Sequence, residues 1–165
     1  MQNLPFLHDD GGRTTDDLLA LEGQYRIDSL VSAFEMALME KTQPTEPEIV
    51  VLAVEAIERE VNNGGFSQFF ANSSGEHAYF APFALRAIGA PRTAELVERA
   101  VYLVAGDEVL DADALQAKMA DSDELLDKQL HELDKVYYEG EEEPLADKLF
   151  EFIKRNRASI AANAP

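Results

Sequence analysis

The stretch Asn62-Asn63-Gly64-Gly65-Phe66-Ser67-Gln68-Phe69-Phe70-Ala71-Asn72 decides the fold. It combines two adjacent glycines with three phenylalanines and four side-chain amides. Asparagine and glycine readily take the left-handed conformation that ends a helix, and phenylalanine side chains favour burial. We therefore predict a structural elbow at Asn63, Gly64, Gly65 and Phe66, where one helix ends and a short aromatic helix begins.

Apolar residues recur at helical spacing on both sides of this elbow. Upstream, we predict one helix from Asp17 to about Lys41 and a second that Thr45 caps and that reaches the elbow. The helices predicted downstream cover residues 66–71, 76–88, 91–104, 122–138 and 145–158. Residues 107–121 are expected to be irregular with one helical turn. Since no segment alternates like a strand, the predicted class is all-α, a compact single-domain bundle of about seven helices with short loops.

We expect residues 1–13 to form an N-terminal extension, residues 14–158 a single helical domain and residues 159–165 a C-terminal tail. A chain of 165 residues is long enough for one domain with a real core. No apolar run approaches the ~20 residues of a membrane span, and the first residues lack the pattern of a signal peptide. There is no cysteine. These features favour a cytoplasmic protein.

The charge is strongly one-sided, with 32 acids against 14 bases and a net charge of −18. Residues 1–60 carry −9 and residues 107–151 carry −12, whereas residues 61–106 are neutral. An acidic surface argues against direct binding to nucleic acid or to an anionic membrane. It favours association with a basic partner.

Carboxylates spaced by three, four and seven along a helix lie roughly 5–10 Å apart, which is comparable with the spacing of phosphates along a DNA strand. Solvated acidic helix faces are common, so charge alone leaves that simpler interpretation open. The candidate partner-binding carboxylates are Asp16, Asp17, Asp28, Glu35, Glu55, Glu58, Asp107, Glu108, Asp111, Asp113, Asp123, Glu124, Asp127, Asp134, Glu141, Glu142 and Glu143.

No pattern in the chain is typical of an enzyme or a metalloprotein. The glycines of the elbow are not followed by the Lys-Ser/Thr of a phosphate-binding loop. His131 shares a helix face with Asp127 and Asp134, but we interpret it as a histidine in an acidic surface rather than a metal ligand. The four amides of the elbow could line a pocket, although capping of helix ends is the favoured interpretation. We expect no catalytic residue, no cofactor and no metal.

The segment Glu60-Val61-Asn62-Asn63-Gly64-Gly65-Phe66-Ser67-Gln68-Phe69-Phe70-Ala71-Asn72-Ser73-Ser74-Gly75, followed by Ala84-Leu85-Arg86-Ala87-Ile88-Gly89-Ala90, resembles the signature of a bacterial domain-of-unknown-function family. The resemblance covers roughly residues 45–140. That family includes an acidic protein described as a DNA mimic. The resemblance therefore implies a homodimer whose carboxylates form a DNA-like array and bind a helix-turn-helix transcription regulator.

Three functional hypotheses follow. The first is a DNA mimic that keeps a dimeric helix-turn-helix regulator off its operator. The alternative is an acidic immunity or inhibitor protein that caps a basic toxin or nuclease, which the charge would serve equally well. The third is an enzyme with a pocket formed by the amides and aromatic rings of the elbow. We favour the first and expect no enzymatic activity.

Overall fold

Eight α-helices and two short 3-10 helices form the fold in the computed structural model, which describes residues 3–140 and 142–163. In chain order they are α1 (Thr15–Leu19), α2 (Ile27–Leu38), α3 (Glu46–Ala71), η1 (Ser73–His77), α4 (Ala81–Ala87), α5 (Pro91–Ala105), α6 (Ala112–Ala120), α7 (Glu124–Tyr138), α8 (Leu145–Arg155) and η2 (Arg157–Ser159). The described ranges contain no β-strand, only one isolated bridge. The predicted all-α class is confirmed, with one α-helix more than the roughly seven expected.

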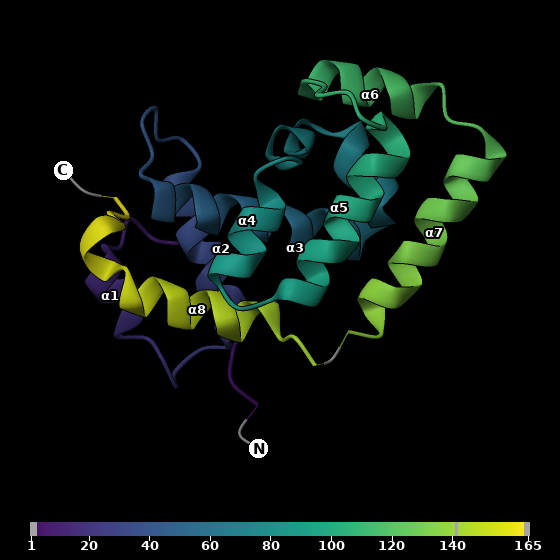
Figure 1. Cartoon of the computed structure of the whole chain (residues 1–165). Helices are drawn as coiled ribbons and strands as arrows, with labels where there is room; N and C mark the ends of the chain where they lie inside the picture. The colour runs from purple at the N-terminus through teal and green to yellow at the C-terminus, as the bar shows by residue number, and fades with distance from the viewer. Residues whose placement is uncertain (1–2, 141, 164–165) are drawn as a thin grey trace.

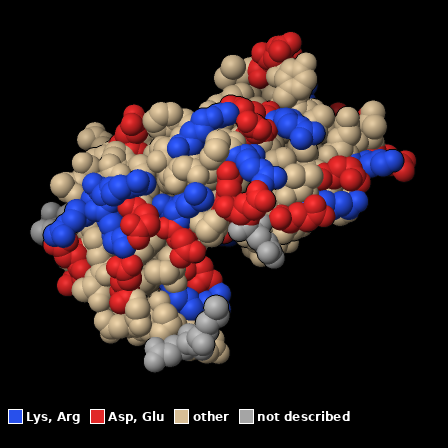
Figure 2. Space-filling model, turned by 60° about the horizontal axis from the view of Figure 1, so that its bottom comes forward, with Lys and Arg blue, Asp and Glu red and all other residues tan. Residues whose placement is uncertain are grey.

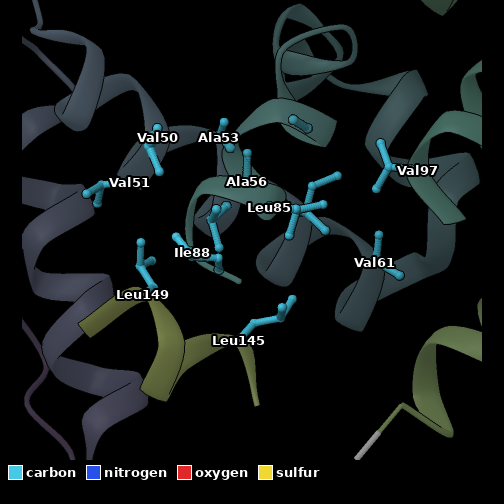
Figure 3. Packing of buried hydrophobic residues seen from close by; sticks show 14 of the residues in the cluster. Val50, Val51, Ala53, Ala56, Val61, Leu85, Ile88, Val97, Leu145 and Leu149 are labelled. Carbon is cyan, nitrogen blue, oxygen red and sulfur yellow. The ribbon is translucent and has the colours of Figure 1, made fainter. Parts of the chain in front are cut away.

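Helix α3 is central, since it packs against α2, α4, α6, α7 and α8 (Figure 1). The predicted cap at Thr45 is confirmed: its hydroxyl accepts a hydrogen bond from the Glu48 N–H, and the Glu48 carboxylate accepts one from the Thr45 N–H. Figure 3 shows side chains of α3 lying among residues of α4 and α8. Burial of α3 on several sides explains its continuous apolar run from Ile49 to Val54.

The helix predicted from Asp17 to Lys41 is wrong as a single element. The chain forms α1, turns through residues 20–26 and then forms α2. Gly23 lies in this turn with a positive φ of 78°. Leu21 and Tyr25 within the turn still pack against the core, so the apolar periodicity continues through a segment that is not helical.

Two further boundaries differ from the prediction. The segment 76–88 divides into the end of η1 and the short helix α4. Residues 112–120, expected to be mostly irregular, form α6. Only Leu115 and Met119 of α6 are buried, which leaves too weak an apolar pattern for the sequence to indicate this helix.

The described parts of the two termini pack against the helices. Leu7 is buried, and so are Ile160 and Ala162 near the other end of the chain. The Thr15 hydroxyl joins the two ends, because it donates to the Ile160 carbonyl at 2.8 Å and accepts from the Ala162 N–H at 3.0 Å. No helix within the described ranges is both long and apolar enough to cross a membrane.

Candidate partner-binding surface

Two of the predicted surface carboxylates lie inside the protein, which corrects their assignment. Glu55 on α3 is 5% exposed and Asp134 on α7 is 7% exposed. Glu55 accepts a hydrogen bond from the Ser32 hydroxyl at 2.9 Å, and Asp134 accepts one from the Phe66 N–H at 2.8 Å. Burial removes both from the array because a partner at the surface cannot reach them.

Burial also changes the ionisation of these acids. Desolvation, together with the nearby charges of Glu35 and Glu58, raises the pKa of Glu55 to about 8. Desolvation likewise raises the pKa of Asp134, although the Phe66 N–H opposes the shift. Neither group behaves as an exposed, phosphate-like anion.

Several other predicted carboxylates are engaged within the protein. Salt bridges join Asp16 to Arg157, Asp28 to Arg26, Glu35 to Arg59 and Glu142 to Arg92. Asp17 takes part in the capping box of α1, and Glu58 accepts a hydrogen bond from the Tyr137 hydroxyl. Together with the burial of Glu55, these contacts engage every carboxylate of residues 1–60 that was predicted to bind a partner. Glu141 lies outside the described residues.

Glu143 has a structural role that the sequence did not reveal. Its carboxylate accepts hydrogen bonds from the Arg92 N–H at 3.0 Å and from the N–H and hydroxyl of Thr93 at 2.9 Å and 2.7 Å. It therefore caps the N-terminus of α5, where the first backbone N–H groups have no partner in the helix. Partial burial opposes ionisation, but these donors hold the pKa of Glu143 below its usual range.

Most of the predicted carboxylates that remain exposed and free of salt bridges lie in one part of the chain, residues 107–127. We call this set the acidic end; its members are Asp107, Glu108, Asp111, Asp113, Asp121, Asp123, Glu124 and Asp127. None of them lies within 4.0 Å of a lysine, arginine or histidine nitrogen among the described residues. Lys118 is the single base in this segment. Asp121 was not among the predicted site residues.

The acidic end is built by helix capping and by one anchoring tyrosine. Asp111 and Asp123 are the N-caps of α6 and α7, and each accepts a backbone hydrogen bond at 2.8 Å. The Tyr79 hydroxyl donates to the Glu108 carbonyl at 3.1 Å and accepts from the Leu110 N–H at 2.9 Å. Tyr79 thus ties the loop between α5 and α6 to the body of the protein.

The first turns of α7 project beyond the core, which explains why their acids stay exposed. The buried residues of α7 begin at Leu130, and Leu125 is 63% exposed. Asp127 and Asp134 are two turns apart on one face of α7. Of these two, only Asp134 contacts the elbow, where it accepts a hydrogen bond from the Phe66 N–H. The predicted partner-binding carboxylates of α7 therefore do not form a continuous exposed row, because Asp134 is buried.

Apolar side chains accompany the charges of the acidic end. Val109 is 84% exposed and Leu125 is 63% exposed. Elsewhere the surface is mixed in charge: Figure 2 shows a face where lysine and arginine side chains lie among carboxylates. The acidic end therefore differs from that face in its nearly uniform sign of charge.

The elbow is a packed kink within α3, where the backbone angles of Gly64 and Gly65 are not helical, as predicted for this stretch. Gly65 has a φ of 75°, and a Cβ atom added there would lie 2.3 Å from the Asp134 Oδ2. Only glycine satisfies both the backbone conformation and the close approach of this carboxylate. A hollow of about 650 Å³ between the end of α3 and α6 is lined by Gln68, but not by Asn63 or Asn72.

Two of the elbow amides bind a buried carboxylate that sequence reasoning missed. Glu60 is 6% exposed and accepts hydrogen bonds from Gln68 and Asn72, both at 2.8 Å, and from Ser74 at 2.9 Å. Burial disfavours its charge, but these donors, aided by the Arg59 guanidinium, hold the pKa of Glu60 below its usual range. The kink brings these groups together, so no simple helical spacing could have indicated the cluster.

Comparison with known proteins identifies one family. A family model described as DMP19-like protein matches residues 42–156, which is more than two thirds of the chain. Neither the search of curated proteins nor that of solved structures returned a match. The matched range contains the elbow and the whole acidic end, but not Asp16, Asp17, Asp28 or Glu35.

Proposed function

The chain belongs to the DMP19-like protein family, and from this premise we propose that it is a DNA mimic that binds a basic, DNA-binding regulator through its acidic end. Membership of this family is consistent with DNA mimicry. The expected partner is a dimeric helix-turn-helix transcription regulator in the cytoplasm, held off its operator. The proposed activity is binding without catalysis, and it requires no cofactor.

The exposed and unpaired carboxylates of residues 107–127 are the observation that carries this proposal. Eight acids and one base give this segment a net charge of −7. The DNA-binding surface of a regulator is basic because it neutralises phosphates. A single-sign carboxylate surface offers the same electrostatic attraction. Neighbouring carboxylates one helical turn apart, such as Glu124 and Asp127, have Cβ atoms roughly 5–6 Å apart.

The acidic end also carries features that DNA phosphates lack. Val109 and Leu125 are exposed beside the charges, and apolar contacts add selectivity to an attraction that every basic protein would feel. We propose that the protein acts as a homodimer, because regulators of this class read two half-sites about 34 Å apart. Two acidic ends would then face the two DNA-binding surfaces of the regulator.

A competition assay tests the proposal. The components are this protein, the helix-turn-helix regulator encoded nearest to its gene and a fluorescently labelled operator. At low salt the protein should displace the labelled operator from the regulator. This competition should weaken as salt rises, because each ionic contact between the protein and the regulator adds about one to the slope of log K for their binding against log salt. A regulator that stays on its operator at low salt would contradict the proposal for that partner.

A pair of charge-matched variants locates the interaction. The test variant carries Asp113→Asn, Asp121→Asn, Glu124→Gln and Asp127→Asn, which leaves both helix caps intact. The control carries Asp9→Asn, Glu40→Gln, Glu46→Gln and Glu139→Gln, which removes the same charge from exposed positions elsewhere. The test variant should lose competition and reduce the salt slope by about 4, whereas the control should retain both. Equal losses would show that total charge, not the acidic end, governs binding.

A further inference from the structure

Helix α5 packs against α4 and against α7, and a hollow lies along each of these two junctions (Figure 1). The hollow between α4 and α5 measures about 490 Å³, and the one between α5 and α7 about 700 Å³. Glu98 and Tyr102 of α5 line both hollows. The side chain of Tyr102 is 62% exposed, so it stands at the border between them. We call the residues that line the two hollows the α5 face.

The α5 face presents apolar side chains to solvent. Phe83 from α4 and Val136 from α7 are exposed on it together with Tyr102, and Leu103 is partly buried beside them. Nine residues line each hollow and two of these line both, so the face offers 16 residues. A standard interface uses roughly 20–30 residues on each side. With its immediate rim, the α5 face therefore has the extent that a stable complex requires.

The charges of the α5 face cancel one another. Its ionic groups, with the partner of Glu132 included, are the acids Glu95, Glu98 and Glu132 and the bases Arg86, Arg99 and Lys135. The Arg86 guanidinium donates to both carboxylate oxygens of Glu98, at 2.7 and 2.9 Å. The Lys135 ammonium lies 2.8 Å from the Glu132 carboxylate. The face is thus neutral in a chain whose net charge is −18.

A neutral face has a particular consequence for a strongly acidic protein. Two copies of the chain repel each other through −18 charges each, so they associate only where carboxylates do not meet carboxylates. The acidic end cannot serve this purpose, because it would oppose its own charge. A basic partner, for its part, finds little attraction on a face whose carboxylates are already paired. Charge therefore directs basic partners to the acidic end and a second copy to the α5 face.

The shape of the α5 face also suits contact with itself. In a two-fold dimer the same surface is used by both protomers, so a projection and a hollow on one face are satisfied together. Tyr102 supplies the projection, and the hollow between α5 and α7 supplies the apolar recess, with Leu103 and Val136 in its lining. The Tyr102 ring of each protomer can thus enter the recess of the other, and the two equivalent contacts form at once.

We propose that the α5 face is the interface between two copies of this chain, with Tyr102 near its centre. This inference rests on the homodimer of the proposed function, to which it assigns an interface. Among the described residues, no member of the acidic end lines either hollow. A dimer formed through the α5 face therefore leaves both acidic ends accessible to a regulator.

Sedimentation equilibrium of a matched pair of variants tests the assignment. The parent protein should sediment as a dimer of 18.3 kDa chains. Tyr102→Asp should weaken the dimer at least about a hundredfold, because a loss of about tenfold occurs at two equivalent sites. Leu125→Asp adds the same charge to a helical side chain that is 63% exposed, but at the acidic end, and should leave the dissociation constant unchanged. Circular dichroism checks that both variants fold.

Two measurements on the parent protein need no variant. In hydroxyl-radical footprinting, Phe83 and Tyr102 should be oxidised more slowly above the dissociation constant of the dimer than below it, whereas Leu125 should react equally at both concentrations. Rising salt should strengthen the dimer at least about tenfold, because it screens the repulsion between two acidic chains. The same salt should weaken binding to a basic regulator, so the two associations are distinguished by sign.

A parent protein that stays monomeric up to about 1 mM would overturn the proposal and leave the α5 face to an uncharged partner of another kind. Equal weakening by Tyr102→Asp and Leu125→Asp would show a general effect of charge and would also overturn it. A dimer that keeps Tyr102 reactive, or that weakens as salt rises, would place the interface elsewhere, and the proposed homodimer would then stand without this assignment. Failure of the parent protein to displace the operator would contradict mimicry and leave the interface unaffected.

Discussion

The buried carboxyl group of Glu55 should make the stability of this protein depend on pH. Its one hydrogen bond comes from Ser32, and no lysine or arginine nitrogen lies within 4.0 Å of it in the described ranges. Desolvation, reinforced by the charges of Glu35 and Glu58, raises the pKa of Glu55 from its ordinary value of 4.5 to about 8. At pH 7 the folded protein therefore holds a neutral acid that would be ionised in the unfolded chain.

The size of the effect follows from the two pKa values. Each unit of difference corresponds to about 1.4 kcal/mol, so the shift of Glu55 costs about 5 kcal/mol once the group is ionised in both states. Below pH 4.5 both states are protonated and no cost arises. As pH rises from 4.5 to 8 the folded state binds the extra proton, so stability falls, and the loss reaches about 3 kcal/mol at pH 7.

Glu55→Gln removes the titration and keeps an oxygen that can accept from the Ser32 hydroxyl. Urea unfolding monitored by circular dichroism at pH 5, 7 and 9 measures the free energy of unfolding of both proteins. The stability of the variant relative to the parent should rise across this series by about 4 kcal/mol. Glu40→Gln, the same change on an exposed side chain, should show no such trend. A difference between Glu55→Gln and the parent that stays constant from pH 5 to 9 would refute the reasoning.

Three further substitutions probe the elbow and the acidic end. Gly65→Ala should lower the free energy of unfolding by about 2 kcal/mol more than Gly106→Ala. Both substitutions strain a backbone with positive φ, but only the Cβ at position 65 collides with the Asp134 carboxylate and disturbs its hydrogen bond to the Phe66 N–H. Equal losses in urea unfolding would contradict this expectation. Glu60→Ala should cost about 3–5 kcal/mol by leaving buried donors unpaired, and a melting temperature close to that of the parent would argue against the cluster. Tyr79→Phe should accelerate hydrogen exchange of the Leu110 amide about fivefold, since the hydroxyl that accepts from it is lost; unchanged exchange would show that the loop is held by other contacts.

The fold class and the position of the elbow could be predicted because both depend on local signals. Apolar spacing indicates helices, and adjacent glycines indicate where a helix cannot continue unchanged. The break between α1 and α2 could not be found in this way, since Leu21 and Tyr25 pack on the core from a turn. Helix α6 was missed for the opposite reason: it is a helix with few buried residues.

The sequence predicted the acidic character of the candidate site, but not which of its carboxylates are exposed. Helical spacing assigns Asp127 and Asp134 to one face, yet the first is exposed and the second is buried against the elbow. Whether a carboxylate of α7 is exposed or buried depends on the element that packs against its turn, and helical spacing alone does not reveal that element. The same holds for Glu143, whose role as a cap depends on α5, about 50 residues earlier in the chain.

The elbow and the acidic end are mechanically connected through α7, although the first is neutral and the second is charged. Asp134 binds the Phe66 N–H, and the Tyr138 hydroxyl donates to the Val61 carbonyl at 2.5 Å, so the second half of α7 is fixed to both sides of the kink in α3. The first half of α7, which carries Asp127, extends from that anchorage. The direction of the α7 part of the acidic end is therefore tied to a conformation that only glycine adopts readily at position 65. Through this connection a neutral, aromatic junction would contribute to the proposed electrostatic recognition by orienting α7.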